Sequence, residues 1–175
     1  MKILIAGAGE VGTHLAKLLG QENHDITLID ADKDRLALIR DNTDILTYIG
    51  NCTSIKALTE AGALHTDLYI GVTPEESKNI TSCMLASNLG AKRTLARIDN
   101  YEYLLPKNKD FFEKLGIHSM IYPELIAARE IAMSLKTPWA RFWWELCNGT
   151  VILAAAKVRE NAPIVNIYLS DLGQT

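Results

Sequence analysis

A glycine-rich run and one acid near the start of the chain have the residue types and spacing that dinucleotide binding needs. The run is Gly7-Ala8-Gly9-Glu10-Val11-Gly12, and Asp30 follows its last glycine by 18 residues (30 − 12). Gly7 allows a tight turn, Gly9 lets the backbone approach a pyrophosphate, and Gly12 lets a helix pack close to a sheet. The run therefore predicts a dinucleotide-binding turn.

The two parts of this motif bind different chemical groups. Unpaired N–H groups at the positive end of a helix that starts near Glu10 would hold phosphates. The carboxylate of Asp30 can accept both hydroxyls of an adenosine ribose and would repel a 2′-phosphate, which favours NAD(H) or an adenine nucleotide over NADP. Two plainer interpretations stay open: a glycine turn that binds nothing, and a role for Asp30 or Asp32 in capping the next helix.

Strands and helices alternate along the chain and must position these groups. Apolar patterns predict strands at 2–6, 26–30, 45–49, 67–72, 94–98 and 119–121, and helices at 10–20, 33–41, 54–61, 75–89, 101–115 and 123–135. This alternation predicts an α/β fold, a Rossmann-like doubly wound parallel sheet of about six strands. Because parallel strands end at one edge, four segments are expected to line one crevice: Gly7–Gly12, Asp30, Gly50–Cys52 and Thr73–Glu76.

The composition excludes several other classes of protein. The 175 residues are 48% hydrophobic, which is enough for a buried core. The net charge of −3 gives no indication of nucleic-acid binding. No apolar run is long enough to span a membrane, and the first strand leaves no room for a signal peptide, so we expect a cytoplasmic protein. The three cysteines and four histidines show no metal-ligand spacing.

The amino-acid composition changes after Pro138. Segments 141–147 and 150–157 flank Asn148-Gly149, a strong hairpin turn signal, and a turn at 160–163 precedes segment 164–172. We predict a nucleotide-binding domain at 1–135, followed at 136–175 by a hairpin linker and the start of a truncated second domain.

Large rings gather in this second region. The cluster comprises Trp139, Phe142, Trp143 and Trp144. Alternate residues of a strand face opposite sides, so both faces carry rings. A dimer contact is favoured over simple packing, because exposed aromatic patches usually mark interfaces.

Further motifs resemble the RCK/KTN domain, the nucleotide-binding regulatory domain of bacterial Trk- and Ktr-type potassium uptake systems and of some potassium channels. The resemblance covers residues 1–135 in order, and Ala162-Pro163-Ile164-Val165 resembles the opening of the C-terminal domain of such proteins. Besides the glycine run, the motifs are Gly50-Asn51-Cys52-Thr53, Gly71-Val72-Thr73-Pro74-Glu75-Glu76-Ser77-Lys78-Asn79, Ala96-Arg97-Ile98, Gly116 and Ile121-Tyr122-Pro123-Glu124.

The resemblance implies a cytosolic subunit that binds NAD(H) or ATP/ADP and transmits its occupancy to a membrane potassium pore. Gly7–Gly12 would hold the phosphates and Asp30 the ribose. Asn51 and Cys52 would lie by the adenine, where the family usually has Asp in place of Asn51. The turn from Thr73 to Glu76 would close over the far half of the ligand.

The role of Arg97 stays open between a contact to a phosphate or a neighbouring subunit and a surface ion pair. The resemblance further implies a homodimer, which can assemble further, with Tyr122–Leu135 and the segment after it at the interface. It also implies a membrane potassium transporter subunit as partner. The protein would lie in the cytoplasm, peripheral to the inner face of the membrane, without inserting into it.

The alternative is an NAD-dependent oxidoreductase fragment without its substrate domain. Hydride transfer to a carbonyl needs a proton donor or acceptor, commonly His, Lys or a Tyr–Lys pair. The predicted ligand-edge turns offer Asn51, Cys52, Thr73, Pro74 and Glu75 instead. We therefore expect a regulatory module and no catalytic or metal-binding residues.

Overall fold

A computed structural model describes the chain except for residues 41–42, 148, 169 and 172–175. The chain divides into two compact units, Met1–Glu124 and Leu125–Thr175, and each is described by itself. The predicted end of the nucleotide-binding domain at residue 135 stays a prediction.

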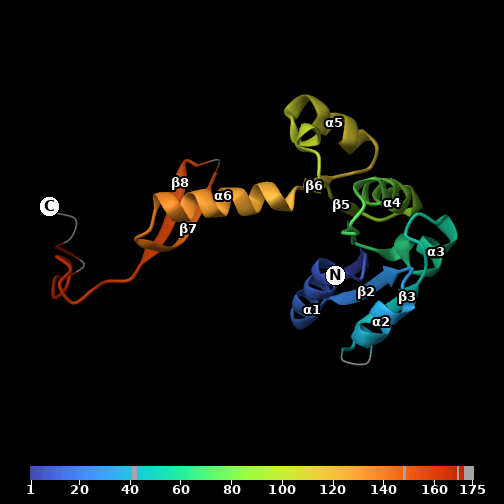
Figure 1. Cartoon of the computed structure of the whole chain (residues 1–175), viewed down its shortest axis with the longest axis horizontal. Coiled ribbons are helices and arrows are strands. Elements are labelled where there is room, and N and C mark those ends of the chain that lie inside the picture. The colour runs from blue at the N-terminus through green and yellow to red at the C-terminus, as the bar shows by residue number, and fades with distance from the viewer. Residues whose placement is uncertain (41–42, 148, 169, 172–175) are drawn as a thin grey trace. The chain divides into compact units, whose positions relative to one another are not determined.

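The first unit is built on six parallel strands. They are β1 (Lys2–Ala6), β2 (Asp25–Asp30), β3 (Leu46–Ile49), β4 (Leu68–Gly71), β5 (Arg93–Arg97) and β6 (Ser119–Ile121). Their order in the sheet is β3-β2-β1-β4-β5-β6 (Figure 1). The predicted Rossmann-like sheet is confirmed, and its strand order reverses direction between β1 and β4, where open α/β sheets bind ligands.

Six α-helices and two short 3₁₀ helices occur among the described residues. The α-helices are α1 (Glu10–Gln21), α2 (Lys33–Arg40), α3 (Ile55–Glu60), α4 (Glu76–Leu89), α5 (Pro106–Lys114) and α6 (Pro123–Lys136), and the 3₁₀ helices are η1 (Ala63–His65) and η2 (Tyr101–Leu104). Residue 41, the predicted end of the second helix, lies outside the described residues. No helix in the described ranges has both the length and the apolarity to cross a bilayer.

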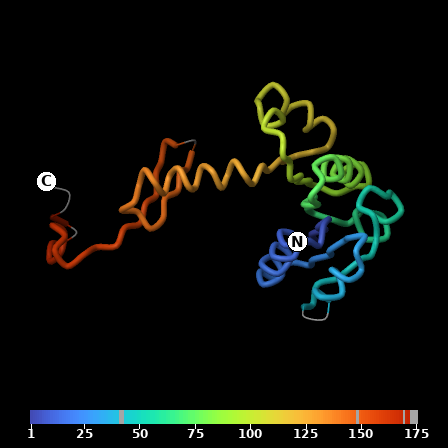
Figure 2. The backbone as a smooth tube through the Cα atoms, in the orientation of Figure 1, coloured from blue at the N-terminus to red at the C-terminus, as the bar shows by residue number. Residues whose placement is uncertain are grey.

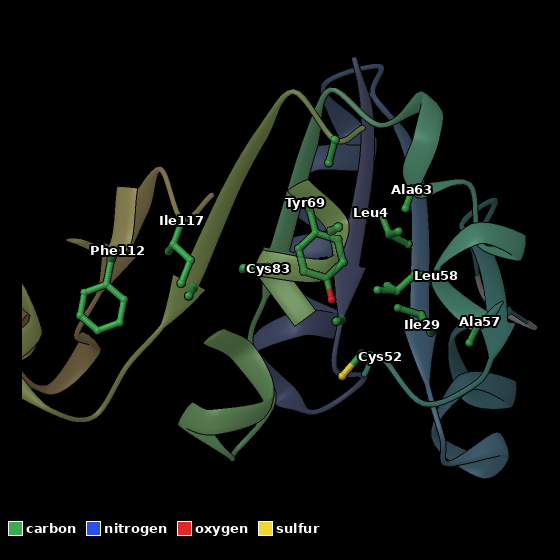
Figure 3. Close-up of a cluster of buried hydrophobic side chains, with 14 of the residues drawn as sticks. Leu4, Ile29, Cys52, Ala57, Leu58, Ala63, Tyr69, Cys83, Phe112 and Ile117 are labelled. Carbon is green, nitrogen blue, oxygen red and sulfur yellow. The ribbon is translucent and has the colours of Figure 1, made fainter. Parts of the chain in front are cut away.

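Apolar side chains cover the sheet on both faces because neighbouring residues of a strand point to opposite sides. Ile5 lies in one buried cluster with Ala16 of α1. Leu4, its neighbour in β1, lies in the other cluster with Leu58 of α3 and Cys83 of α4 (Figure 3). The sheet is therefore wound on both sides, with α1 and α2 on one face and α3 and α4 on the other.

The predicted single helix at 101–115 is wrong. The segment forms η2, then breaks at Leu105 in an extended conformation (φ −63°, ψ 139°), and α5 begins at Pro106. The proline ring disfavours helical geometry in the residue before it and lacks an N–H for a bond to the preceding turn. Proline is well tolerated at the first position of α5, where no such bond is needed.

The second unit contains an antiparallel hairpin of β7 (Ala140–Leu146) and β8 (Val151–Ala156), which confirms the hairpin prediction. Figure 2 traces the chain from α6 into this hairpin. Of the predicted Asn148-Gly149 turn, Asn148 lies outside the described residues, while Gly149 has a positive φ of 84°. Segment 164–172 forms turns and no regular element where it is described.

Both faces of β7 carry aromatic rings, as the alternation predicts. Phe142 and Trp144 stack with their centroids 5.9 Å apart, and Trp143 meets Trp139 edge-on at 6.1 Å. Phe142 and Trp144 are more than half exposed in the single chain. The dimer contact stays a prediction.

Candidate functional site

The glycine run folds into a tight turn between β1 and α1. Gly7 has a φ of 110°, which other residues rarely adopt, and its N–H donates to the Ile29 carbonyl at 2.9 Å. A Cβ on Gly12 would lie 1.8 Å from the Gly7 carbonyl oxygen, so only glycine fits where α1 crosses this turn. The packing role predicted for Gly12 is therefore visible in the backbone geometry.

Gly9 differs from these two glycines because a Cβ there would meet no atom within 4 Å. Its backbone is ordinary (φ −74°, ψ −173°), and it stands at the N-cap of α1, where no described side chain caps the helix. The first-turn N–H groups of α1 therefore lie beside open space, an arrangement suited to an anion.

We expect Gly12→Ala to destabilise the fold by about 1–3 kcal/mol, because its methyl group must displace backbone. Gly20→Ala is the matched control, since a Cβ on Gly20 in the same helix meets nothing within 4 Å. That control should stabilise the helix by up to about 1 kcal/mol. Urea unfolding of both variants measures the difference, and equal stabilities would contradict the packing role of Gly12.

A cleft of about 270 Å³ opens at the carboxyl edge of the sheet, at the switch point. It is lined by Gly7, Ile29, Asp30, Ala31, Arg35, Gly50, Asn51, Cys52, Thr73, Pro74, Glu75 and Lys78. The fold thus brings together five of the predicted site residues: Gly7, Asp30, Asn51, Cys52 and Thr73. A neighbouring hollow of about 550 Å³ is lined by Ala8, Gly9 and Glu10 among others, and Arg35 lines both.

Four predicted site residues lie outside these two linings. Val11 is half exposed and Gly12 is packed against the turn. Glu76 accepts hydrogen bonds at 2.6 and 2.8 Å from the N–H groups of Asp99 and Asn100. Arg97 pairs through Nη2 with Glu124 at 3.2 Å and with Asp99 at 3.7 Å. These two side chains hold the loop after β5, and the structure favours the ion-pair interpretation of Arg97.

Asp30 reaches from the end of β2 to the glycine turn. Its Oδ2 accepts from the Ala8 N–H at 2.6 Å, and its Oδ1 accepts from the Asp32 N–H at 2.9 Å. Each carboxylate oxygen can accept a second hydrogen bond, so the group can still receive two hydroxyls. Asp32 caps α2 instead, since its Oδ1 accepts from the N–H groups of Asp34 (2.9 Å) and Arg35 (3.2 Å).

Asn51 and Cys52 form the cleft wall after β3. The Asn51 side-chain oxygen accepts from Thr53 N–H at 3.0 Å and from Thr53 Oγ1 at 2.9 Å, which leaves the Asn51 amide N–H groups as donors. Cys52 is only 6% exposed, and burial raises the pKa of its thiol, an effect that nearby Lys78 opposes. The hydroxyl of buried Tyr69 points toward Cys52 (Figure 3).

The burial of Cys52 predicts slow alkylation. Iodoacetamide at neutral pH should modify Cys52 about tenfold more slowly than exposed Cys147, or slower still, because the reagent attacks the accessible thiolate. Mass spectrometry of tryptic peptides over time measures the rate at each cysteine, and Cys147→Ser gives the rate of Cys52 with buried Cys83 as the other remaining thiol. Equal rates would show that the cleft wall opens readily.

Three polar residues at the site were not assigned from the sequence: Arg35, Lys78 and Asn79. Arg35 pairs through Nε with Asp32 at 3.2 Å, and Lys78 pairs with Glu75 at 2.5 Å. Helical spacing could have pointed to Lys78 and Asn79 in the sequence. They follow Glu75, at the start of α4, by three and four residues. Glu75 raises the pKa of Lys78, with a smaller effect from Asp30.

Buried Asn79 holds the turn that contains Thr73. Its Oδ1 accepts from Thr73 N–H and from Thr73 Oγ1, both at 2.8 Å. The cleft thus combines two cations, two carboxylates and a rigid turn, which suits a ligand with both phosphates and hydroxyls.

A larger hollow of about 770 Å³ lies at the opposite edge, at the amino ends of the strands, where Lys2, His24 and Asp25 help to line it. It contains neither the glycine turn nor any other predicted site residue. We place the candidate site at the carboxyl edge because the helix N-terminus and the switch point coincide there.

Comparison with known proteins identifies relatives of the whole chain. A family model described as the TrkA-N domain matches residues 3–123. The "Trk system potassium uptake protein TrkA" of Haemophilus influenzae is 35% identical over 172 residues, which are 97% of this chain and 38% of that protein. The TrkA homolog of Methanothermobacter thermautotrophicus is 33% identical, over all of this chain and 78% of that protein. The chain thus spans well under half of the first relative.

Solved structures share the fold at lower identity. The TrkA-N domain of the inner membrane protein ybaL from Escherichia coli has a TM-score of 0.66 at 18% identity, over 77% of this chain and 96% of that one. GsuK bound to ADP has a TM-score of 0.63 at 22% identity, over 78% and 34%. The GsuK channel bound to NAD has 0.57 at 16% identity, over 69% and 21%.

Proposed function

The chain belongs to the TrkA-N domain family, and from this premise we propose that it is the nucleotide-sensing part of a potassium uptake system. The protein binds NAD(H) or ATP/ADP in the cleft at the switch point and couples occupancy to a membrane pore. The observation that carries the proposal is the pairing of Asp30, with acceptor capacity left, and the open N-terminus of α1 beside Gly9.

The residues around the cleft match the parts of such a ligand. The N–H groups at Gly9–Gly12 suit its phosphates, and Asp30 suits the ribose hydroxyls. Asn51 offers amide donors to a base edge. Arg35 and Lys78 add positive charge along the same cleft. The ADP and NAD complexes of GsuK concern a protein that shares only the fold, so they leave the choice of nucleotide to experiment.

Partners and location follow from the same premise. The relatives are named as Trk potassium uptake proteins, which supports a membrane potassium transporter subunit as partner and a place in the cytoplasm at the inner face of the membrane. A homodimer, with further assembly allowed, uses Tyr122–Leu135 and the aromatic residues of β7. Residues 1–135 form the nucleotide-binding domain, and 136–175 begin the C-terminal part.

The cleft is poorly equipped for hydride-transfer chemistry. Among its described lining residues, Lys78 is the one that commonly serves as a proton donor or acceptor in such enzymes. Its pairing with Glu75 raises the pKa of Lys78, whereas a catalytic lysine needs a pKa near the working pH. This supports the regulatory role over an oxidoreductase fragment.

Calorimetric titration of the 175-residue chain with NADH, NAD, ADP, ATP and NADP tests the proposal. We expect micromolar binding of NAD(H) or of ATP/ADP and much weaker binding of NADP, because the Asp30 carboxylate repels a 2′-phosphate. Absence of binding by all five would refute a nucleotide-sensing role for this chain. Tight binding of NADP would refute the assignment of Asp30 to the ribose.

A further inference from the structure

The side chain of Asn79 is buried and bridges two strand ends at the cleft. It is 1% exposed. Besides the two bonds that its Oδ1 accepts from Thr73, its Nδ2 donates to the Thr73 carbonyl at 2.9 Å and to the Arg97 carbonyl at 3.0 Å. Its two N–H donors and two lone pairs are thus all used, so any movement of Thr73 must disturb at least one of these bonds.

The two hydrogen-bond partners of Asn79, Thr73 and Arg97, lie at the ends of two neighbouring strands. Thr73 follows β4 and lines the cleft. Arg97 is the last residue of β5, which pairs with β4. Gly71 permits this close arrangement, since a Cβ there would lie 3.2 Å from the Cα of Asn79. The amide therefore ties the cleft turn to the end of the neighbouring strand.

The side chain of Arg97 continues from that strand end to α6. Its Nη2 lies 3.2 Å from Oε1 of Glu124, in the first turn of α6, and the Arg97 side chain is 24% exposed. Its Nε is buried without a hydrogen-bond partner among the described atoms. The Ile98 N–H also donates to the Ile121 carbonyl at 2.8 Å, just before α6 begins.

We propose that Asn79 is a positioning residue that transmits occupancy of the cleft, through the Arg97 backbone and the Arg97–Glu124 pair, to the first turn of α6. This inference rests on the proposed nucleotide-binding function and names the route by which that site acts. A ligand that contacts Thr73 changes the hydrogen bonds offered to Asn79, and the Asn79 amide passes the change to β5. Such coupling requires that the ligand bind one arrangement of these groups more tightly than the other.

Asn79→Asp tests the route because it keeps the size and the acceptor oxygen but removes the two donated bonds. Asn88→Asp is the matched control. It makes the same change on the same helix, where exposed Asn88 donates to the Met84 carbonyl at 3.0 Å. We expect Asn79→Asp to weaken binding of ADP or NADH about fivefold or more relative to Asn88→Asp.

Hydrogen–deuterium exchange distinguishes the proposed role from a purely structural one, because only the proposed role links ligand binding to exchange at the start of α6. In the unmodified chain, saturating ADP or NADH should slow exchange in segments 97–100 and 124–127. Asn79→Asp at ligand saturation should lose the change at 124–127, and Asn88→Asp should keep it. A retained change in Asn79→Asp would overturn the proposal.

Glu124→Gln keeps the proposal testable if Asn79→Asp fails to fold, because Glu124 is more than half exposed. The ligand-dependent change should persist at 97–100 and fall at 124–127, and an undiminished change at 124–127 would overturn the route. Calorimetry distinguishes failure of the proposed nucleotide-binding function from failure of the proposed role of Asn79. Absence of nucleotide binding refutes the proposed function, whereas binding without any change at 124–127 refutes only the role of Asn79.

Discussion

Asp30→Ala is expected to weaken binding of NADH or ADP by about a hundredfold or more. Two charge-assisted hydrogen bonds to the ribose would be lost, each worth roughly 1.5–3 kcal/mol. The Ala8 N–H would also lose its acceptor at 2.6 Å, so the glycine turn should loosen as well. Isothermal titration of the variant with the ligand that the unmodified chain prefers measures the loss.

Asp32→Ala is the control for this experiment. It removes the same charged group two residues away and costs the α2 cap, about 1 kcal/mol of stability. Its affinity for the nucleotide should stay close to that of the unmodified chain. If the two variants bind equally well, the ribose lies elsewhere, and if both lose binding equally, net charge rather than a specific contact explains the effect.

Gly9→Val is expected to abolish nucleotide binding while the protein stays folded. The backbone at Gly9 is allowed for any residue, and a Cβ there meets no atom within 4 Å. The valine side chain would therefore occupy the space beside the N-terminus of α1 that a phosphate needs. Because no described side chain caps α1 at Gly9, the stability cost should be no more than about 1 kcal/mol.

Gly20→Val is the matched control, since Gly20 lies in the same helix and also has open space at its Cβ position. Circular dichroism should show both variants folded, and titration should show binding only in Gly20→Val. Nucleotide affinity that survives in a folded Gly9→Val protein would mean that phosphates bind away from this turn.

The fold and eight of the twelve residues that line the cleft could be predicted, because local rules decide the elements and the turns that follow them. Runs of apolar residues set the strands, and Gly7 and Gly12 meet geometric demands that only glycine satisfies. The single failure among the helices, at Leu105 and Pro106, also has a local cause, the restriction of the residue before proline. The order of elements then implied which strand ends meet at the carboxyl edge.

Glu76 and Arg97 show where prediction from the sequence ended. Both stand at the expected edge, but each has a partner far along the chain that draws its side chain away from the cleft: the Asp99 and Asn100 N–H groups for Glu76, and Glu124 for Arg97. A charged side chain takes whichever partner the folded backbone brings near, and spacing along the chain does not rank such partners.

By itself, the sequence determined the alternation of strands and helices, the glycine turn and the presence of Asp30 at the end of β2, because each depends on residues close together in the chain. Only the tertiary structure decided that Asp30 holds the Ala8 N–H while Asp32 caps α2. It alone placed Arg35 and Lys78 along the cleft and joined Asn79 to both Thr73 and Arg97. Short-range sterics and hydrophobic periodicity depend on neighbouring residues, so the sequence shows them directly. Which partner a polar group takes depends on the groups that the fold brings near it, so only the tertiary structure shows it.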